Sequence, residues 1–310
     1  MAEAGILGHR AAAATTPRSL EARSEAIAWG LAAPATLLMA AMLIGPVLAV
    51  VLLAFTDYQL GAETLQWVGL ENFREMAKER TFWRSLGNTL LYAAVVVPGS
   101  VALGLGVALL IESGPSLRAF YRAVFFIPVM ATLIAMAISW EFMLHPSFGL
   151  VNLSLKALGI AGPNWLRTEG LALWVIAVIG VWQQFGFNMV LFLAGLVSIP
   201  RALYEAAALD GAASPWERFR LVTWPMLGPV TLFVVVITAI RAFQVFDTVA
   251  VLTKGGPSKS TEVLLYSMYA EGFEFFRSGY ASAITVVFLL LVLVVTLVKT
   301  RVLEKRVHYA

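Results

Sequence analysis

The sequence contains no cysteine and only three histidines among its 310 residues. Without cysteine, it can form no disulfide bond, no thiolate metal site and no cysteine nucleophile. No apolar segment holds a paired acid and base, a nucleophile or a cluster of metal ligands, which argues against an intramembrane enzyme. We therefore expect the chain to bind no metal and no cofactor, to catalyse no reaction and to have no nucleic-acid partner.

A phosphate-binding loop is absent as well. The pattern Gly-x-x-x-x-Gly-Lys-[Ser/Thr] occurs nowhere in the sequence. The short run Gly255-Gly256-Pro257 reads as a turn and not as a phosphate cradle. If the function of this protein requires ATP and Mg²⁺, another chain has to bind them.

Charged residues are scarce, whereas apolar ones are abundant. Only 13% of the residues are charged and 60% are hydrophobic, and the mean hydropathy is +0.82, outside the range of soluble globular domains. Six long windows lack Asp, Glu, Lys and Arg, and each is long enough to cross a bilayer core about 30 Å thick. The windows are continuously apolar, unlike the alternating ten-residue segments of a barrel. The sequence therefore predicts an all-α membrane protein with six transmembrane helices.

The windows define one membrane domain over residues 27–301. The predicted helices cover about 27–55, 86–111, 121–144, 171–198, 225–252 and 279–298, with a hydrophilic loop at 199–224. A flexible segment, 1–26, precedes the domain and a tail, 302–310, follows it. Six crossings put both termini on one side, and that side carries twelve Lys and Arg residues against nine on the other. This small bias favours cytoplasmic termini.

The loop at 199–224 has the local signals of two short helices that meet at a turn. Residues 202–208 favour a helix, and Gly211 supplies the left-handed conformation that ends one. Ser214 is a suitable cap for a second helix, Pro215 suits its first position, and Glu217 can bond back to the Ser214 amide. Pro225 then marks the entry to the next span. The sequence predicts a helical hairpin between spans four and five.

The loop contains Glu205, Ala206 and Ala207, then three residues, then Gly211, with Pro225 further on. With this pattern the sequence strongly resembles the inner-membrane permeases of binding-protein-dependent ABC importers. Their EAA motif is Glu-Ala-Ala, three residues, Gly, then a hydrophobic pair and Pro. Thirteen residues separate Gly211 from Pro225, one more than the family pattern implies. Further weak matches at 69–73, 193–200, 243–247 and 253–257 look like the carbohydrate-uptake branch, of the maltose and glycerol-3-phosphate type, so that the resemblance covers about 27–301. The motif residues are Glu205, Ala206, Ala207, Asp210, Gly211 and Pro225.

The resemblance implies a multi-subunit importer in the bacterial cytoplasmic membrane. Its expected partners are a second, different permease subunit, two ATP-binding subunits that hold ATP and Mg²⁺, and an extracytoplasmic solute-binding protein. In such an assembly the first helix of the hairpin docks into a cleft on the ATPase and transmits its closure. The motif residues are then the coupling contact.

Polar residues within the spans form two further candidate sites. A charge at the centre of a span costs about 2.5 to 3.5 kcal/mol on an insertion scale, so it is expected to face a partner or a water-filled path. In span five, Arg241, Gln244 and Asp247 follow at three-residue steps, which spreads them over about 120° of a helix. Amides and aromatic rings suit hydroxyl-rich solutes. The candidate path residues are Trp182, Gln183, Gln184, Asn188, Arg241, Phe243, Gln244, Phe246 and Asp247.

Two alternatives stay open at this point. The polar residues can instead hold helices and subunits together through interhelical hydrogen bonds or an ion pair. For function, the sequence favours import of a sugar or sugar-like solute, with glycerol 3-phosphate or another polyol as the alternative solute. The alternative class is a secondary transporter driven by an ion gradient, for which we find no internal repeat.

Overall fold

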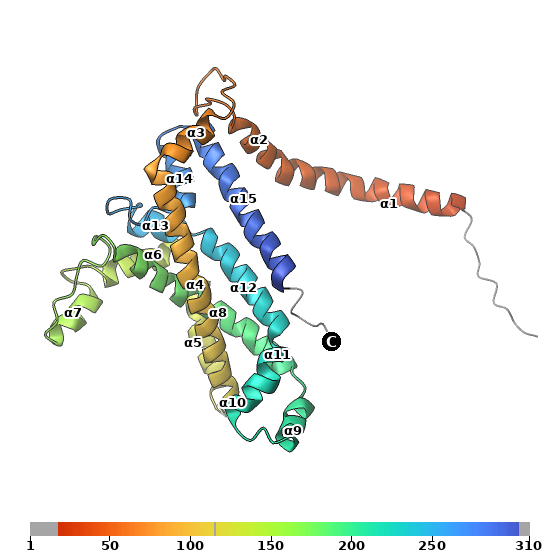
Figure 1. Cartoon of the computed structure of the whole chain (residues 1–310), viewed down its shortest axis with the longest axis vertical. Coiled ribbons are helices and arrows are strands. Elements are labelled where there is room, and N and C mark those ends of the chain that lie inside the picture. The colour runs from red at the N-terminus through yellow and green to blue at the C-terminus, as the bar shows by residue number, and fades with distance from the viewer. Residues whose placement is uncertain (1–17, 115, 304–310) are drawn as a thin grey trace, which may run out of the picture. The chain divides into compact units, whose positions relative to one another are not determined.

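The structure, a computed structural model, describes residues 18–114 and 116–303, with side chains described at 25 and from 27 to 297 outside that gap. Within these residues the chain forms helices, with one isolated antiparallel bridge between Thr56 and Trp67. The chain divides into a unit that ends at Val50 and a larger unit that begins at Val51 (Figure 1). Most of the predicted terminal segments, residues 1–17 and 304–310, lie outside the described residues. Residues 18–26 are helical and run directly into the first span.

The first unit is an apolar helix with a local widening. It consists of α1 (Arg18–Met39), a π-helical turn (Ala40–Ile44) and the start of α2 (Gly45–Leu53). The amide of Gly45 donates to the carbonyl of Ala40, five residues earlier. The turn lies directly before Pro46, which has no amide to donate and whose ring crowds the preceding turn of a regular helix. The helix therefore accommodates Pro46 with a π turn directly before it.

The larger unit contains the remaining helices. Two short helices, α3 (Glu71–Lys78) and α14 (Leu264–Tyr269), lie at the end of the unit where α4 begins. A π turn (Ala270–Glu274) follows α14. The other helices are α4 (Arg80–Ser113), α5 (Arg118–Met130), α6 (Leu133–Met143), α7 (Leu150–Ala157), α8 (Ala172–Ser198), α9 (Arg201–Leu209), α10 (Pro215–Arg218), α11 (Trp224–Met226), α12 (Gly228–Phe243), α13 (Asp247–Leu252) and α15 (Ser278–Leu303).

Five segments of the described chain are long and apolar enough to cross a membrane without a sharp bend. They are Ile27–Leu53, Arg80–Ser113, Ala172–Ser198, Gly228–Leu252 and Ser278–Leu297. The third predicted span, 121–144, is instead the pair α5 and α6, bent by 97°. The bend lies at Ala131 and Thr132, two residues with extended backbone. Hydropathy does not reveal it, because both arms are apolar.

The core of the larger unit is the pair α4 and α8, which pack closely. A Cβ atom at Gly104 of α4 would lie 2.8 Å from the Cβ of Asn188 on α8, so only glycine allows this approach. The Asn188 amide donates to Ser100 Oγ of α4 at 3.2 Å and accepts from Thr238 Oγ1 of α12 at 3.0 Å. One buried side chain thus links three helices, which is how polar groups commonly join helices in membranes.

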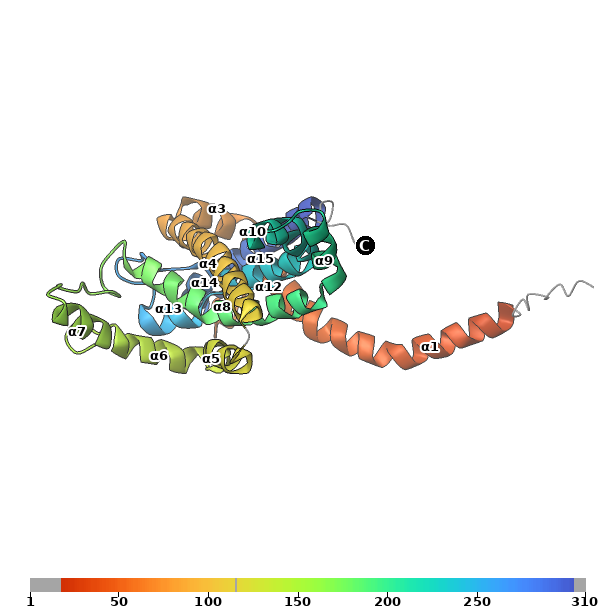
Figure 2. The ribbon, with the colours of Figure 1, turned by 90° about the horizontal axis from the view of Figure 1, so that it is seen from below.

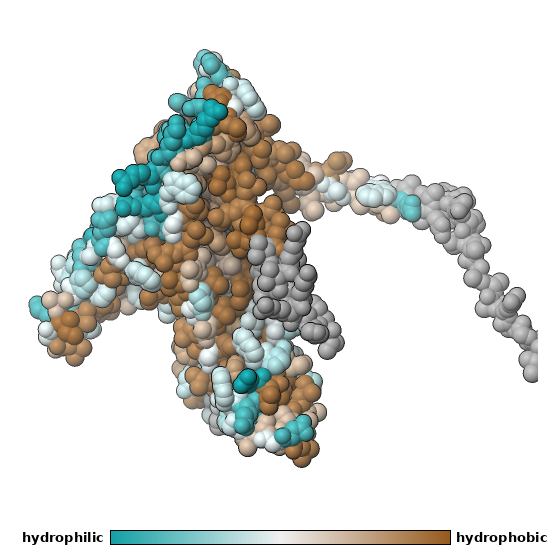
Figure 3. All heavy atoms as spheres, in the orientation of Figure 1, coloured by the Kyte–Doolittle hydropathy of each residue, from teal (hydrophilic) through white to brown (hydrophobic). Residues whose placement is uncertain are grey.

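The larger unit has two polar ends and an apolar middle. Figure 1 places the hairpin α9–α10 at one end, with the connection from α4 to α5, and α3 and α14 at the opposite end. Figure 3 shows hydrophobic residues over the middle, and hydrophilic residues around the hairpin and along the edge that carries α3, α13 and α14. Seen from below in Figure 2, α5, α6 and α7 follow one another along one side of the unit.

Candidate functional site

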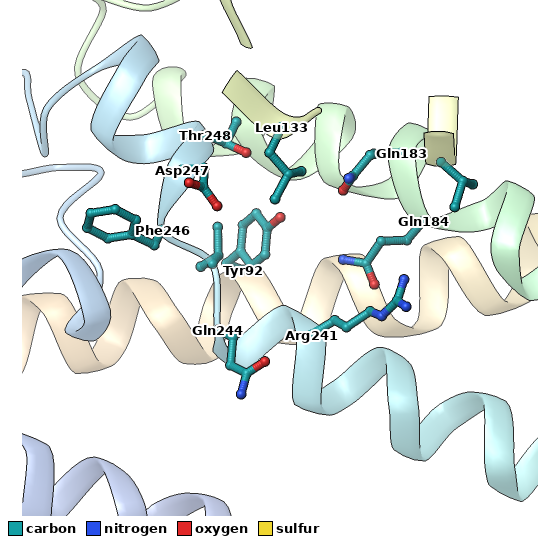
Figure 4. A pocket seen from close by; sticks show the side chains of 11 residues that line it. Tyr92, Leu133, Gln183, Gln184, Arg241, Gln244, Phe246, Asp247 and Thr248 are labelled. Atoms are coloured by element: carbon teal, nitrogen blue, oxygen red, sulfur yellow. The ribbon is translucent and has the colours of Figure 1, made fainter. Parts of the chain in front are cut away.

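A polar cavity of about 330 Å³ lies among α4, α5, α6, α8 and the junction of α12 with α13. It brings together the two polar clusters expected from the sequence, because Gln183 and Gln184 of α8 face residues from the end of α12 (Figure 4). The lining residues are Tyr92, Val129, Leu133, Gln183, Gln184, Arg241, Gln244, Val245, Phe246, Asp247 and Thr248.

The cavity owes its shape to a break in the fifth span. α12 ends at Phe243 and α13 begins at Asp247, with Gln244 and Phe246 in non-helical conformations between them. The expected continuous helix, with polar groups spread over about 120°, is therefore interrupted. Arg241, Gln244 and Asp247 nevertheless all line the cavity. Irregular backbone at membrane depth is tolerated where it lines a cavity or is buried in protein.

Arg241 and Gln184 lie at one end of the cavity and leave hydrogen-bonding groups unused (Figure 4). The Arg241 guanidinium carbon lies 4.2 Å from the centre of the Phe187 ring, a cation–π contact. Gln184 is 7% exposed, and its Oε1 atom has no hydrogen-bond partner. Within the described residues, Arg241 makes no ion pair. Asp247 and Thr248 lie toward the other end, and the amide of Gln244 turns away from these groups (Figure 4).

Three predicted path residues do not line this cavity. Trp182 packs edge-on against Trp140, with ring centres 5.4 Å apart. Asn188 is 1% exposed and makes the helix-linking hydrogen bonds described above. Phe243 is buried in the hydrophobic core. For Asn188, the structure favours the alternative role of joining helices.

Tyr92 is a lining residue that the sequence did not single out. It is buried, and a Cβ atom at Gly180 would overlap its hydroxyl group, so Gly180 of α8 makes room for Tyr92 of α4. The sequence offered one indication of this role, namely a tyrosine inside an otherwise apolar window. Its meaning depends on the glycine of another helix, which no local pattern reveals.

The hairpin at 199–224 forms as the local signals predict. Gly211 has φ +95°, and the amide of Ala212 bonds to the carbonyl of Ala207 at 2.9 Å, which closes the end of α9. Ser214 and Glu217 form both bonds of the capping box, at 3.1 Å and 2.9 Å. The amide and hydroxyl of Ser214 lower the pKa of the Glu217 carboxyl below its ordinary value.

One face of α9 is fixed to the protein and the other is free. Tyr204 shares a hydrogen bond of 3.0 Å with Thr223, and Tyr204 and Ala207 pack on the core at this end. Of the predicted coupling residues, Ala207 therefore lies on the inner side. The outer face consists of Ala202, Glu205, Ala206 and Leu209, all exposed, with Leu209 at 90%. Asp210 and Gly211, at the end of the helix, are exposed as well.

The additional residue between Gly211 and Pro225 has a structural counterpart. Phe219–Thr223 forms a π-helical turn, in which the Trp224 amide bonds to the Phe219 carbonyl five residues earlier. A π turn holds one residue more than an α turn. Pro225 follows as the second residue of α11. The connection then continues through a turn at Leu227, whose amide bonds to the Thr223 carbonyl at 2.9 Å, into α12.

The residues with side chains described contain no group of three or more His, Cys, Asp or Glu side chains that could hold a metal ion. His145 stacks on Phe148 with ring centres 3.6 Å apart, and its Nδ1 accepts a hydrogen bond from the Ser147 amide. These contacts describe a structural histidine at the end of α6.

Comparison with known proteins agrees with this architecture. The model of the family "binding-protein-dependent transport system inner membrane component" matches residues 100–309. The trehalose/maltose transport permease MalF of Thermococcus litoralis is 38% identical over 76% of this chain and 79% of its own. The sulfoquinovosyl glycerol transport permease SmoG of Agrobacterium fabrum is 32% identical over 93% and 94%. The glycerol-3-phosphate permease UgpA of Pectobacterium atrosepticum is 33% identical over 79% and 82%.

A solved structure shows the same fold. A chain of a bacterial alginate ABC transporter, crystallised with an alginate-bound periplasmic protein, superposes with a TM-score of 0.81 at 21% identity. The match covers 94% of this chain and 98% of that one. The alternative of an ion-gradient-driven transporter finds no support among these relatives. This chain belongs to the family of inner-membrane components of binding-protein-dependent transport systems, and it is a multi-pass permease subunit of an ABC importer and not an enzyme.

Proposed function

We propose that this chain forms one half of the import path for a sugar or sugar-like solute and that the solute is held briefly in the cavity between α8 and α12. The observation that carries the proposal is the gathering of amide, hydroxyl and aromatic groups from three separate segments around one space at the break of a span. Such groups bind hydroxyl-rich molecules through hydrogen bonds and ring stacking. Relatives named for trehalose/maltose, sulfoquinovosyl glycerol and glycerol-3-phosphate transport support the solute class.

The hairpin gives this path a connection to an ATP-driven motor. Its free face combines small alanines, which permit close helix packing, with Glu205, which can bind a basic group on a partner. We assign Glu205, Ala206, Asp210 and Gly211 to contact with a cytoplasmic ATPase that binds ATP and Mg²⁺. Ala207 packs on the core behind this face, and Pro225 is exposed at the entry to the next span. Both termini are then cytoplasmic, because they lie on the same side as the hairpin in a six-crossing chain.

Both arms of the hairpin lead to helices that line the cavity. α9 follows α8 directly, and α8 carries Gln183 and Gln184. The second arm continues through the π turn and α11 into α12, which carries Arg241. The two arms are joined by the Tyr204–Thr223 hydrogen bond and by the packing of Ile199, Val222 and Leu227. A displacement of α9 is therefore transmitted as a rigid body to the two helices that face each other across the cavity.

In this proposal a second, different permease subunit supplies the other half of the path, and two ATPases and an external binding protein complete the importer. The family match and the alginate ABC transporter, which was crystallised with a periplasmic protein, support these partners.

The experiment is uptake by proteoliposomes that contain the complete importer, with labelled trehalose, maltose and glycerol 3-phosphate as solutes. We expect uptake of at least one of them that requires ATP hydrolysis. Gln184→Ala, Gln244→Ala and Asp247→Ala should lower uptake while the complex still assembles. Uptake driven by a proton or sodium gradient without the ATPase subunits would contradict the proposal. Loss of assembly in the three variants would instead assign these residues to contacts between subunits.

A further inference from the structure

We infer that the Arg241 end of the cavity is a subsite for an anionic group, so that the imported solute is an acidic sugar or a sugar phosphate. This inference rests on the proposed function and names the chemical class of its solute. The names of the relatives do not decide the point, since trehalose and maltose are neutral whereas glycerol 3-phosphate is an anion.

Arg241 lies near the middle of the membrane-crossing segment Gly228–Leu252 and is exposed in this chain. A cation at this depth is costly, and arginine stays charged at every physiological pH. Its position in the last turn of α12 and the ring of Phe187 offset part of the cost. Neither of these two interactions occupies the N–H groups of the guanidinium with a hydrogen bond. Among the described residues, none accepts a hydrogen bond from this guanidinium.

The unused donors have the geometry of anion recognition. A guanidinium presents its N–H groups in a rigid fork that matches two oxygens of a carboxylate, sulfonate or phosphate. The fork lines a cavity of about 330 Å³, which has room for part of a small sugar. Beside it, the buried Gln184 Oε1 atom lacks a donor. A hydroxyl group of the same solute satisfies that atom when the anion sits on Arg241.

The one acidic group that lines the cavity, Asp247, lies toward the opposite end, beside Thr248 and Phe246 (Figure 4). Asp247 is the first residue of α13. The cavity therefore has a cationic end and an end that accepts hydrogen bonds. An acidic sugar fits only one way round, with its anion on Arg241 and its hydroxyl groups toward Asp247.

The test measures binding of glucose, glucuronate and glucose 6-phosphate to the complete importer in nanodiscs without the binding protein, by saturation-transfer NMR. We expect at least one of the two acids to bind about tenfold or more tightly than glucose, as one charge-assisted interaction allows. The tighter acid distinguishes a carboxylate site from a phosphate site. Arg241→Gln should abolish the preference, and Arg241→Lys should retain part of it. Gln184→Leu should weaken all three sugars similarly.

Arg167→Gln is the matched control, because it removes the same charge from an exposed position outside the cavity. It should leave the preference unchanged. Equal affinity of the wild type for the three sugars, or no binding of either acid, overturns the inference. So does failure of Arg241→Gln to assemble when Arg241→Lys assembles, because the charge then serves a subunit contact. Retained ATP-driven uptake of a neutral sugar would in those cases leave the proposed function standing.

Discussion

The two polar ends of the larger unit differ in the side-chain interactions that hold them to the rest of the unit. At the end with α3 and α14, Arg277 pairs with Glu75 and, at 3.2 Å, with Glu271, and the Tyr280 hydroxyl donates to Glu79. The loop before α14 is tied to α4 by further bonds, including one from the Asn88 amide group to the Glu262 carbonyl at 2.8 Å. Within the part of the chain that the structure describes, the hairpin end is joined to the core at its base, by packing and the Tyr204–Thr223 bond.

This difference indicates which end of the unit another protein could cover. The end with α3 and α14 is held together by its own ion pairs and hydrogen bonds, so it can present a fixed surface. The hairpin keeps its outer face free, with large apolar side chains exposed at Leu209 and Trp216. Exposed apolar groups beside a small-residue helix face are typical of a surface that another protein covers. Changes at the hairpin should therefore affect coupling, whereas changes at the other end should affect stability.

The largest effect is expected for Glu205→Lys on the free face of α9. In the proposed contact with the ATPase, the substitution replaces a carboxylate that would pair with a basic group by a cation that would repel it, so solute-stimulated ATP hydrolysis should fall about tenfold or more. Thermal stability of the subunit should not change, because Glu205 is exposed. ATPase assays on the reconstituted importer measure the effect. Glu63→Lys, the same change at an exposed site outside the hairpin, is the control, and equal loss there would contradict the comparison.

A smaller effect, on stability, is expected for Arg277→Met. It leaves Glu271, a mostly buried carboxylate, and Glu75 without their cation. Because Arg277 is itself about one third exposed (36%), solvent screening limits the cost to about 1 to 2 kcal/mol. The melting temperature should fall while solute-stimulated ATPase activity per folded complex is kept. Arg74→Met, which breaks the exposed Arg74–Glu71 pair of 3.5 Å, should have almost no effect.

Tyr204→Phe should loosen the base of the hairpin. It removes one neutral hydrogen bond, worth about 0.5 to 1.5 kcal/mol, without changing the ring that packs on the core. We expect more ATP hydrolysed per solute transported. Thr223→Val removes the same bond from the other side, so the double variant should be no worse than either single one. Additive losses would show that the two side chains act independently.

The smallest effect concerns pH. Burial raises the pKa of the Glu262 carboxyl, and that of Glu271, above the ordinary value of 4.5. The folded state therefore binds these protons more tightly, and stability should rise as pH falls from the raised pKa toward 4.5. The gain is lost above the raised pKa. Between pH 7 and pH 5 the melting temperature should rise by less than about 2 °C. Glu262→Gln should reduce it, and a shift of the opposite sign would count against the buried carboxyls as its cause.

The sequence predicted the hairpin almost residue by residue, because its signals are local. Gly211, Ser214 and Glu217 act through backbone groups within three residues of themselves, and the structure confirms the capping box. The apolar windows likewise located five of the spans, although they did not show the break between α12 and α13. The bend at Ala131 and Thr132 was not predicted, because hydropathy reports whether a segment is apolar but not whether its helix changes direction.

The candidate cavity was predictable only in part. Polar residues in a span had to face something, and Gln184, Arg241 and Asp247 indeed meet in one space. Helical periodicity does not fix how a helix is rotated about its axis, so it could not show that Asn188 faces Ser100 and Thr238 instead. The place of Tyr92 depends on Gly180, which is a property of two packed helices.

The 97° bend between α5 and α6 has a consequence for the lipid around this subunit. α5 has 13 residues and α6 has 11, so at about 1.5 Å per residue each arm is about 20 Å long or less, shorter than a hydrocarbon core. The corner between them interrupts the helical hydrogen bonding at Ala131, and acyl chains cannot satisfy the peptide groups that are freed. Val129 and Leu133, on either side of the corner, line the cavity. The freed peptide groups at the corner therefore need water from that cavity, or a neighbouring subunit, as their hydrogen-bonding partner. Lipid cannot cover this side of the protein completely.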